Sequence, residues 1–232
     1  MFNLQDYLGT DLGKNSECLY NITKKYTNSI FVDLGVRSGM SSDIMLIDSE
    51  INNNKVFGVD VDFGPLISKV KENLNYTTIL GDSSTVGKHW TNGEIAGLFI
   101  DTFHIKEQVL CELYHWYPHL KENAFIAFHD SNWPKHKHDV YGGISWDRVD
   151  EAIKDFFIVG EHLNYEDEYF KMVTYPESWG MTIIELKQKK DFISSYKKWD
   201  EVFKKRNELM SLFWNEENKN NILIELNLCT II

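Results

Sequence analysis

The chain is 232 residues long and acidic, with 35 Asp and Glu residues against 24 Lys and Arg residues and a formal net charge of −11. Its content of 43% hydrophobic and 25% charged residues is typical of a globular protein. A disordered chain is excluded, because it would lack the apolar surface that offsets ordering entropy. The negative charge disfavours nucleic acid as a partner, since phosphate backbones carry the same sign. We therefore expect a folded protein that does not bind nucleic acid.

No targeting or membrane segment is predicted. The N-terminus has neither the basic start nor the apolar run of a signal peptide, and no apolar stretch approaches the roughly 20 residues of a membrane helix. The cysteines Cys18, Cys111 and Cys229 are far apart and show none of the paired spacings of zinc sites or disulfide frameworks. We expect a soluble cytoplasmic protein with reduced thiols and no membrane partner.

Short apolar runs that end in Gly or Asp alternate with longer amphipathic segments, which is the pattern of a doubly wound α/β sheet. The turn at residues 175–180 predicts that the last strand is antiparallel, whereas the others are mostly parallel. The predicted strands are residues 30–34, 56–59, 77–80, 98–100, 124–128, 169–174 and 181–186. The predicted helices are residues 41–50, 66–74, 84–90, 107–117 and 146–157.

One α/β domain is expected over residues 29–187, preceded by a helical lead-in at residues 1–28. Residues 188–232 form a C-terminal extension with a charged helix from about residue 191 to residue 214. The short apolar end at residues 222–232 could close the core, cover a sheet edge or make a contact in a homo-oligomer. The sequence leaves these three roles open.

The segment Asp33-Leu34-Gly35-Val36-Arg37-Ser38-Gly39 follows the first strand and precedes a helix, where the backbone must turn sharply and approach a ligand. Its Gly-x-x-x-Gly spacing matches neither the Gly-x-Gly-x-x-Gly of a dinucleotide site nor the Gly-Lys-Ser/Thr of a P-loop. An acid just before the turn also argues against phosphate. The pattern favours a cationic or hydroxyl-bearing ligand, which a buried carboxylate needs.

Polar residues also end the next two strands. Asp60 follows the second strand, where a carboxylate can accept two hydrogen bonds from a ribose diol. Asp82 and Ser83 follow the third strand, where short polar side chains can bond the amine and ring nitrogen of an adenine. The first three strand ends therefore indicate a nucleoside-containing ligand.

Two later segments are more specific. The first runs from Phe99 to Gln108 and reads Phe-Ile-Asp-Thr-Phe-His-Ile-Lys-Glu-Gln, and the second, residues 120–130, is a strand that ends in His129-Asp130. With the preceding strand ends, they resemble the class I S-adenosylmethionine-dependent methyltransferases, over about residues 31–186. Within that class, the chain is similar to small-molecule O-methyltransferases of the catechol O-methyltransferase-like and macrocin-type sugar methyltransferase kinds. One departure is Lys121-Glu122-Asn123, where these enzymes usually have Pro-Gly-Gly; the segment is a turn that does not touch the chemistry.

The resemblance implies a Rossmann-like sheet of seven strands, with an antiparallel last strand, that binds S-adenosylmethionine. The cofactor-binding residues that it implies are Asp33, Gly35 and Gly39 at the methionine end, Ser41 at the cofactor carboxylate, Asp60 at the ribose, Asp82 and Ser83 at the adenine, and Asp101 near the sulfonium.

Methyl transfer to an alcohol or phenol needs an aligned oxygen that loses its proton or is held by a metal. In related metal-dependent enzymes the ligands end the fourth and fifth strands, which implies Asp101, His129 and Asp130 here. His129 departs from the oxygen-only set that suits Mg²⁺ and moves the preference toward Mn²⁺, Fe²⁺ or Zn²⁺. Alternatively, His129 bonds Asp101 and acts as a metal-free general base.

His104 is the first candidate for the general base. It lies three residues after Asp101, where catechol-type enzymes place a basic residue over the acceptor oxygen. The alternative is that it caps the helix that starts near Glu107. The loop of residues 131–143 follows the fifth strand and could act as a lid, and its His136 and His138 are expected to face solvent or the acceptor. Trp146, Trp179 and Tyr175 are expected to be core or rim packing.

The leading hypothesis is an O-methyltransferase of a small molecule, either a sugar or glycan precursor or a phenolic metabolite, with Mg²⁺ or Mn²⁺ as an optional cofactor. An N-methyltransferase of the same fold is less favoured, because nothing like Asn-Pro-Pro-Tyr follows the fourth strand. A non-catalytic nucleotide-binding protein is also less favoured, because it would not need acids at all the strand ends. The first loop disfavours an NAD-dependent oxidoreductase.

Overall fold

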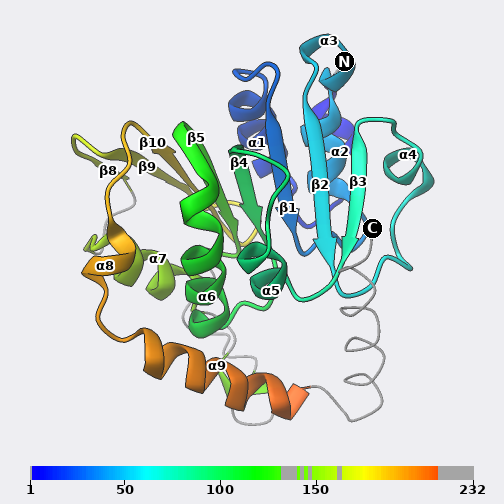
Figure 1. The fold of residues 1–232 in the computed structure, drawn as a ribbon. Helices are drawn as coiled ribbons and strands as arrows, with labels where there is room; N and C mark the ends of the chain where they lie inside the picture. The colour runs from blue at the N-terminus through cyan, green and yellow to red at the C-terminus, as the bar shows by residue number, and fades with distance from the viewer. Residues whose placement is uncertain (1, 132–139, 142–143, 146–147, 161–163, 214–232) are drawn as a thin grey trace.

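The computed structural model describes residues 2–131, 140–141, 144–145, 148–160 and 164–213. Within them, a single eight-stranded sheet has the order β3-β2-β1-β4-β5-β10-β9-β8 (Figure 1). The first five strands in this order are parallel, and β10, β9 and β8 are antiparallel. The strands of this sheet are β1 (Ile30–Leu34), β2 (Lys55–Asp60), β3 (Tyr76–Leu80), β4 (Ile95–Ile100), β5 (Leu120–His129), β8 (Asn164–Glu166), β9 (Phe170–Tyr175) and β10 (Met181–Leu186). A separate pair is formed by β6 (Val140–Tyr141) and β7 (Ile144–Ser145).

Helices cover both faces of the sheet. The α-helices are α1 (Asn15–Thr23), α2 (Met40–Leu46), α3 (Ser49–Asn52), α4 (Ser68–Lys71), α5 (Ser83–Lys88), α6 (Lys106–Trp116), α7 (Val149–Phe157), α8 (Phe192–Ser195) and α9 (Trp199–Phe213). Short 3₁₀ helices lie at Leu4–Asp6 and Tyr117–His119. None of the helices in the described residues is both long and apolar enough to cross a membrane.

The alternation of strand side chains separates two hydrophobic cores. In β1, Phe31 packs with side chains of α1, α2 and α4, whereas Val32 and Leu34 pack with side chains of α6 and α7. The second core also includes Phe192 of α8 and Val202 of α9. The segments before β1 and after β10 therefore share the cores of the central sheet.

The fold class predicted from the sequence is confirmed, and the main sheet has eight strands rather than seven. All seven predicted strands are present in this sheet, and the additional strand β8 has no sequence signal because it is three residues long and polar at both ends. The helix expected at residues 41–50 is divided into α2 and α3, since Asp48 takes a left-handed conformation with φ of 62°. The helix expected at residues 66–74 is the single turn α4. Residues 222–232 and most of the predicted lid lie outside the described residues.

The parallel strands end at one edge of the sheet, which is where open α/β sheets bind ligands. Gly35, Asp60, Gly81, Asp101 and Asp130 each follow or end one of the five strands β1 to β5. This edge holds the candidate site.

Candidate active site

Gly35 lets the loop after β1 pass close to the end of β4. It has φ of 84°, and a Cβ atom built on it would lie 2.1 Å from the carbonyl oxygen of Asp101. Its amide donates to Val59 O, while the amide of Asp101 donates to Leu34 O, both at 2.9 Å. No side chain fits at this position, so the loop requires the glycine that the sequence motif supplies.

Asp33 lies beneath the loop and is fully buried. Its Oδ2 accepts hydrogen bonds from Ser41 Oγ at 2.7 Å and from Ser42 Oγ at 2.5 Å, both from α2. Its Oδ1 has no hydrogen-bond partner among the described residues. Burial raises the pKa of Asp33 to about 7, although both serine bonds lower it. Asp33 therefore holds the start of α2 in place, and Ser41 rather than Asp33 lines the adjacent cavity.

Two adjoining cavities open at the ends of the strands. The small cavity, of about 210 Å³, lies between the ends of β1 to β4 and is also lined by Gln108 of α6 and Met210 of α9. The large cavity, of about 790 Å³, is lined by the loop after β1, by Asp101, His104, His129 and Asp130, and by Trp179. Gly35, Arg37, Asp101 and Thr102 line both. The volumes suit parts of a bound small molecule.

Asp60 lies in the wall of the small cavity. Its Oδ2 accepts from the backbone amide of Arg37 at 2.8 Å, and its Oδ1 accepts from the amides of Val61 and Asp62 at 2.6 and 3.1 Å. These bonds fix the carboxylate against the cavity and tie the loop after β1 to the end of β2. The two amide bonds occupy both lone pairs of Oδ1, whereas Oδ2 keeps one lone pair for a ligand hydroxyl.

Asp82 and Ser83 also line the small cavity, at the end of the neighbouring strand β3. Asp82 Oδ1 caps α5 by accepting from Thr85 N at 2.8 Å, and Asp82 Oδ2 forms an ion pair with Arg206 of α9. Ser83 Oγ donates to the buried Glu112 Oε1. The structure therefore places both predicted residues at the cavity and adds a basic partner for Asp82.

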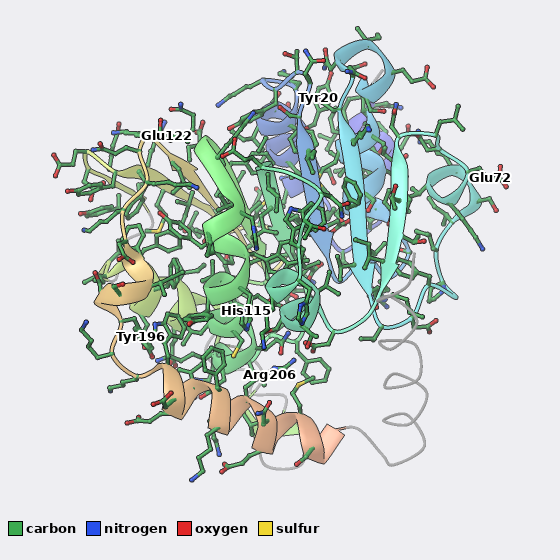
Figure 2. All side chains as sticks on the ribbon, viewed as in Figure 1. Tyr20, Glu72, His115, Glu122, Tyr196 and Arg206 are labelled. Atoms are coloured by element: carbon green, nitrogen blue, oxygen red, sulfur yellow. The ribbon has the colours of Figure 1, made fainter. Side chains whose placement is uncertain are left out.

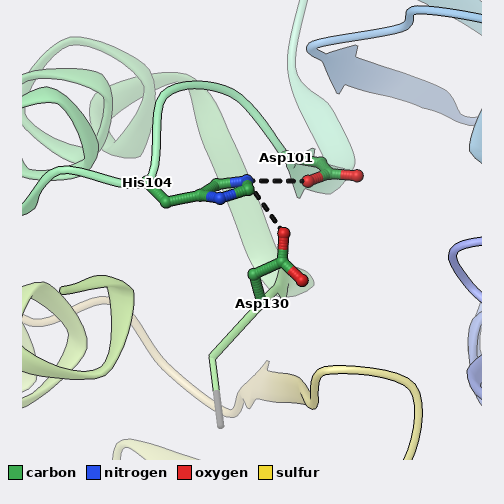
Figure 3. Close-up of side chains that lie close together, drawn as sticks. All are labelled: Asp101, His104 and Asp130. Carbon is green, nitrogen blue, oxygen red and sulfur yellow. Dashed lines mark hydrogen bonds and ion pairs between the residues drawn. The ribbon is translucent and has the colours of Figure 1, made fainter. Parts of the chain in front are cut away.

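Two acids and two histidines meet at the ends of β4 and β5. His104 Nε2 lies 3.2 Å from Asp101 Oδ1 and 3.0 Å from Asp130 Oδ2 (Figure 3). His129 Nδ1 lies 3.3 Å from Asp101 Oδ2 and 3.4 Å from Asp130 Oδ1, while its Nε2 lies 3.2 Å from Ser178 O. Asp130 has a left-handed backbone with φ of 53°. The cluster brings together all four residues that the sequence predicts for catalysis or metal binding.

The charges of the cluster are strongly coupled. Burial alone would lower the pKa of each imidazole, but the facing carboxylates outweigh it and raise the pKa of His104 and of His129 to about 10. Burial would raise the pKa of Asp101, but the two histidines hold it below its usual range. The carboxylates thus favour the protonated form of both histidines, and a cation bound between the carboxylates would lower the pKa of each histidine again.

The cluster fits a divalent cation. Asp101, His104 and Asp130 each offer one ligand atom, and these atoms lie within 4.8 Å of one another. His129 Nδ1 and Asp130 Oδ1 are buried 3.4 Å apart, and neither atom makes a hydrogen bond among the described residues. Two carboxylates and an imidazole suit Mn²⁺, Fe²⁺ or Zn²⁺ better than Mg²⁺. The ligand set Asp101, His129 and Asp130 stays a prediction, and the geometry adds His104 as a second imidazole at the same carboxylates.

Several residues at these cavities carry no motif in the sequence. Trp179, expected as packing, lies at the rim of the large cavity and is 41% exposed. Glu112 is buried beside the small cavity, Met210 of α9 lines it, and Arg206 of α9 pairs with the lining residue Asp82. The pair Glu107-Gln108, shortly after His104, is the sequence feature nearest to Glu112. Trp179, Arg206 and Met210 come from segments that the sequence by itself does not place beside the strand ends.

Residues 32–131 match the model of a family described as a methyltransferase domain. The match contains β1 to β5 and the strand-end residues from Asp33 to Asp130. The resemblance to the class I methyltransferases is thereby confirmed. A comparison with curated protein sequences gives no significant match.

Solved methyltransferase structures share the fold. The methyltransferase PaMTH1 from Podospora anserina, bound to S-adenosylhomocysteine (SAH), is 14% identical with a TM-score of 0.57, over 75% of this chain and 79% of that chain. A putative caffeoyl-CoA O-methyltransferase from Staphylococcus aureus is 13% identical with a TM-score of 0.55, over 74% and 82%. MycE from the mycinamycin biosynthetic pathway, in complex with Mg, SAH and mycinamycin VI, is 17% identical with a TM-score of 0.51, over 78% of this chain and 51% of MycE. Since rRNA methylases also share the fold, it does not select an acceptor.

Proposed function

We propose that the protein is an S-adenosylmethionine-dependent methyltransferase that methylates a hydroxyl group of a small molecule. The observation that carries the proposal is the arrangement of the two cavities, which share Asp101 at their junction. The small cavity is lined by the acid Asp60 and by the polar residues Asp82 and Ser83, which suit a nucleoside. The large cavity contains the cluster of acids and histidines where an acceptor would react.

In this proposal the cofactor lies along the ends of β1 to β4. Asp60 accepts a hydrogen bond from a ribose hydroxyl through Oδ2, and Asp82 and Ser83 bind adenine. The loop after β1 and Ser41 bind the methionine end, with Asp33 acting through Ser41. This placement brings the sulfonium near Asp101, where the two cavities meet.

The acceptor occupies the large cavity, and its volume of about 790 Å³ is in the range of small-molecule sites. His104 is half-buried beside Asp101 and Asp130, so its side chain orients the acceptor oxygen in line with the methyl group. A divalent cation held by Asp101, Asp130 and His104 or His129 would lower the pKa of the acceptor hydroxyl. A histidine of the cluster, in its neutral form, would accept the proton of the hydroxyl.

Methylation of nitrogen, including that of rRNA, is the second candidate. The cluster favours oxygen, because an alcohol or phenol needs deprotonation whereas a neutral amine attacks directly. The net charge of −11 further disfavours RNA. A sugar and a phenolic ring both suit a cavity with an indole ring at its rim.

The test is transfer of a labelled methyl group to a panel of hydroxylated sugars, phenols and RNA, with and without chelator and added Mn²⁺. We expect transfer to one class of hydroxyl compound. His104→Asn should lower kcat by about 100-fold or more while SAH binding is retained, and the exposed His89→Asn serves as the matched control. Transfer to RNA or amines alone, or full activity of His104→Asn, would contradict the proposal.

A further inference from the structure

Helix α9 crosses the outside of α6 and reaches the edge where the parallel strands end (Figure 1). The helix spans 15 residues, Trp199–Phe213. Met210 from its last turn lines the small cavity, together with residues that follow β2 and β3. Arg206 lies one turn earlier on the same face of the helix, because residues four apart are neighbours on a helix surface. Two side chains from one face of α9 thus point at the small cavity or its wall.

Arg206 is nearly buried, with 15% of its side chain exposed, and it points from α9 toward α5 and α6 (Figure 2). Its guanidinium forms an ion pair with Asp82 Oδ2 and donates through Nε to Gln108 Oε1 at 2.8 Å. Gln108 Nε2 in turn donates to Ser83 Oγ at 3.1 Å. Arg206 therefore holds, directly or through one bond, three polar residues that line the small cavity.

The geometry of Arg206 is that of a residue that positions others. Its planar guanidinium bonds two acceptors from different elements in a fixed geometry, which the flexible ammonium of a lysine does not provide. Arg206 engages one lone pair of Asp82 Oδ2, and Thr85 bonds Oδ1, so the Asp82 carboxylate is fixed. Oδ2 keeps a second lone pair that can accept a hydrogen bond from a ligand. The neighbouring Lys204 and Lys205 are exposed, so α9 directs only one of its three consecutive basic residues inward.

We propose that α9 forms part of the cofactor site, with Met210 packed against the adenine ring and Arg206 positioning Asp82 and Gln108 to read the ring's polar edge. This inference rests on the proposed function, since it takes adenine as the occupant of the small cavity. A flexible thioether suits contact with a flat ring. The C-terminal extension is then a required wall of the nucleoside pocket.

The test is calorimetric titration of the full chain with SAH and with S-inosylhomocysteine, in which a carbonyl replaces the adenine amine. Met210→Ala should bind SAH about tenfold more weakly, as expected for the loss of an apolar contact with a base. Arg206→Met should weaken SAH binding by a similar factor and also reduce the preference for SAH over S-inosylhomocysteine. Arg206→Lys should also bind SAH more weakly, because it keeps the charge but lacks the planar fork that holds Asp82 and Gln108 in a fixed geometry.

Lys204→Met, an exposed position on the same helix, is the matched control and should bind SAH within about twofold of the wild type. The melting temperature of each variant, measured without ligand, shows whether the variant is folded. If Arg206→Met is unfolded, the SAH affinity of Arg206→Lys is used in its place. The inference is overturned if Met210→Ala, or a folded Arg206 variant, binds SAH with the same affinity as Lys204→Met. A wild-type protein that binds no SAH instead overturns the proposed function itself.

Discussion

Replacement of Glu112 by glutamine tests the buried network beneath the small cavity. Glu112 is fully buried, and its Oε1 accepts from Ser83 Oγ, Thr102 Oγ1 and Gln108 Nε2 at 2.5, 2.8 and 2.8 Å. Its Oε2 has no hydrogen-bond partner among the described residues. Burial raises the pKa of Glu112 from 4.5 to about 7, against the lowering effect of the three bonds. Glu112→Gln keeps the accepting oxygen and removes the ionisation.

The direction of the pH effect follows from the raised pKa. Below pH 4.5 the carboxyl is protonated in both the folded and the unfolded chain, so it makes no pH-dependent contribution. Between pH 4.5 and about 7 the unfolded chain loses the proton first, and the free energy of unfolding falls as the pH rises. At about 1.4 kcal/mol per pH unit, the loss from this residue reaches at most about 3 kcal/mol above pH 7.

Urea unfolding of the wild type and of Glu112→Gln at pH 5 and pH 8 measures this contribution. We expect the variant to lose less stability than the wild type on going from pH 5 to pH 8, by about 2 kcal/mol. Glu122→Gln at an exposed position is the matched control and should follow the wild type. Parallel pH profiles of Glu112→Gln and the wild type would refute the assignment of a raised pKa to Glu112.

Three further predictions follow from the cavities. Gly35→Ala should lower the free energy of unfolding, measured by urea titration, by at least about 2 kcal/mol, because the added Cβ would meet the carbonyl oxygen of Asp101. Gly9→Ala is the control and should leave the free energy of unfolding unchanged, because a Cβ there would have no atom within 4 Å. Trp179→Ala should raise the KM for the acceptor about tenfold while the Kd for SAH is unchanged; a changed Kd would place the ring elsewhere. Chelation should abolish methyl transfer by the wild type, and added Mn²⁺ should restore it. Added Mn²⁺ should not restore methyl transfer by Asp101→Asn. Wild-type activity that chelation leaves unchanged would show a metal-free reaction.

The strand-end residues were predictable because each follows an apolar run, and parallel strands end at one edge. Asp60, Asp82, Asp101 and Asp130 lie at this edge as the pattern predicts. The strand β8 could not be predicted, since three residues with polar ends carry no alternation of apolar side chains.

The predicted contact between Asp33 and a ligand is the instructive case. Alternation in β1 directs Asp33 to the same face as Phe31, toward α2, where two serines satisfy one of its oxygens. The motif therefore located the loop correctly but could not show which of its residues faces the cavity. Arg206 and Met210 lie more than 100 residues from β3 in the chain, and only tertiary packing brings them to the small cavity.

Calorimetric titration with SAH and NAD tests the central claim, that the strand ends bind S-adenosylmethionine. The account predicts that SAH binds at one site, that NAD does not bind, and that Asp60→Ala weakens SAH binding by at least about tenfold through loss of the ribose acceptor. Binding of NAD without SAH, or an SAH affinity that Asp60→Ala leaves unchanged, would contradict it.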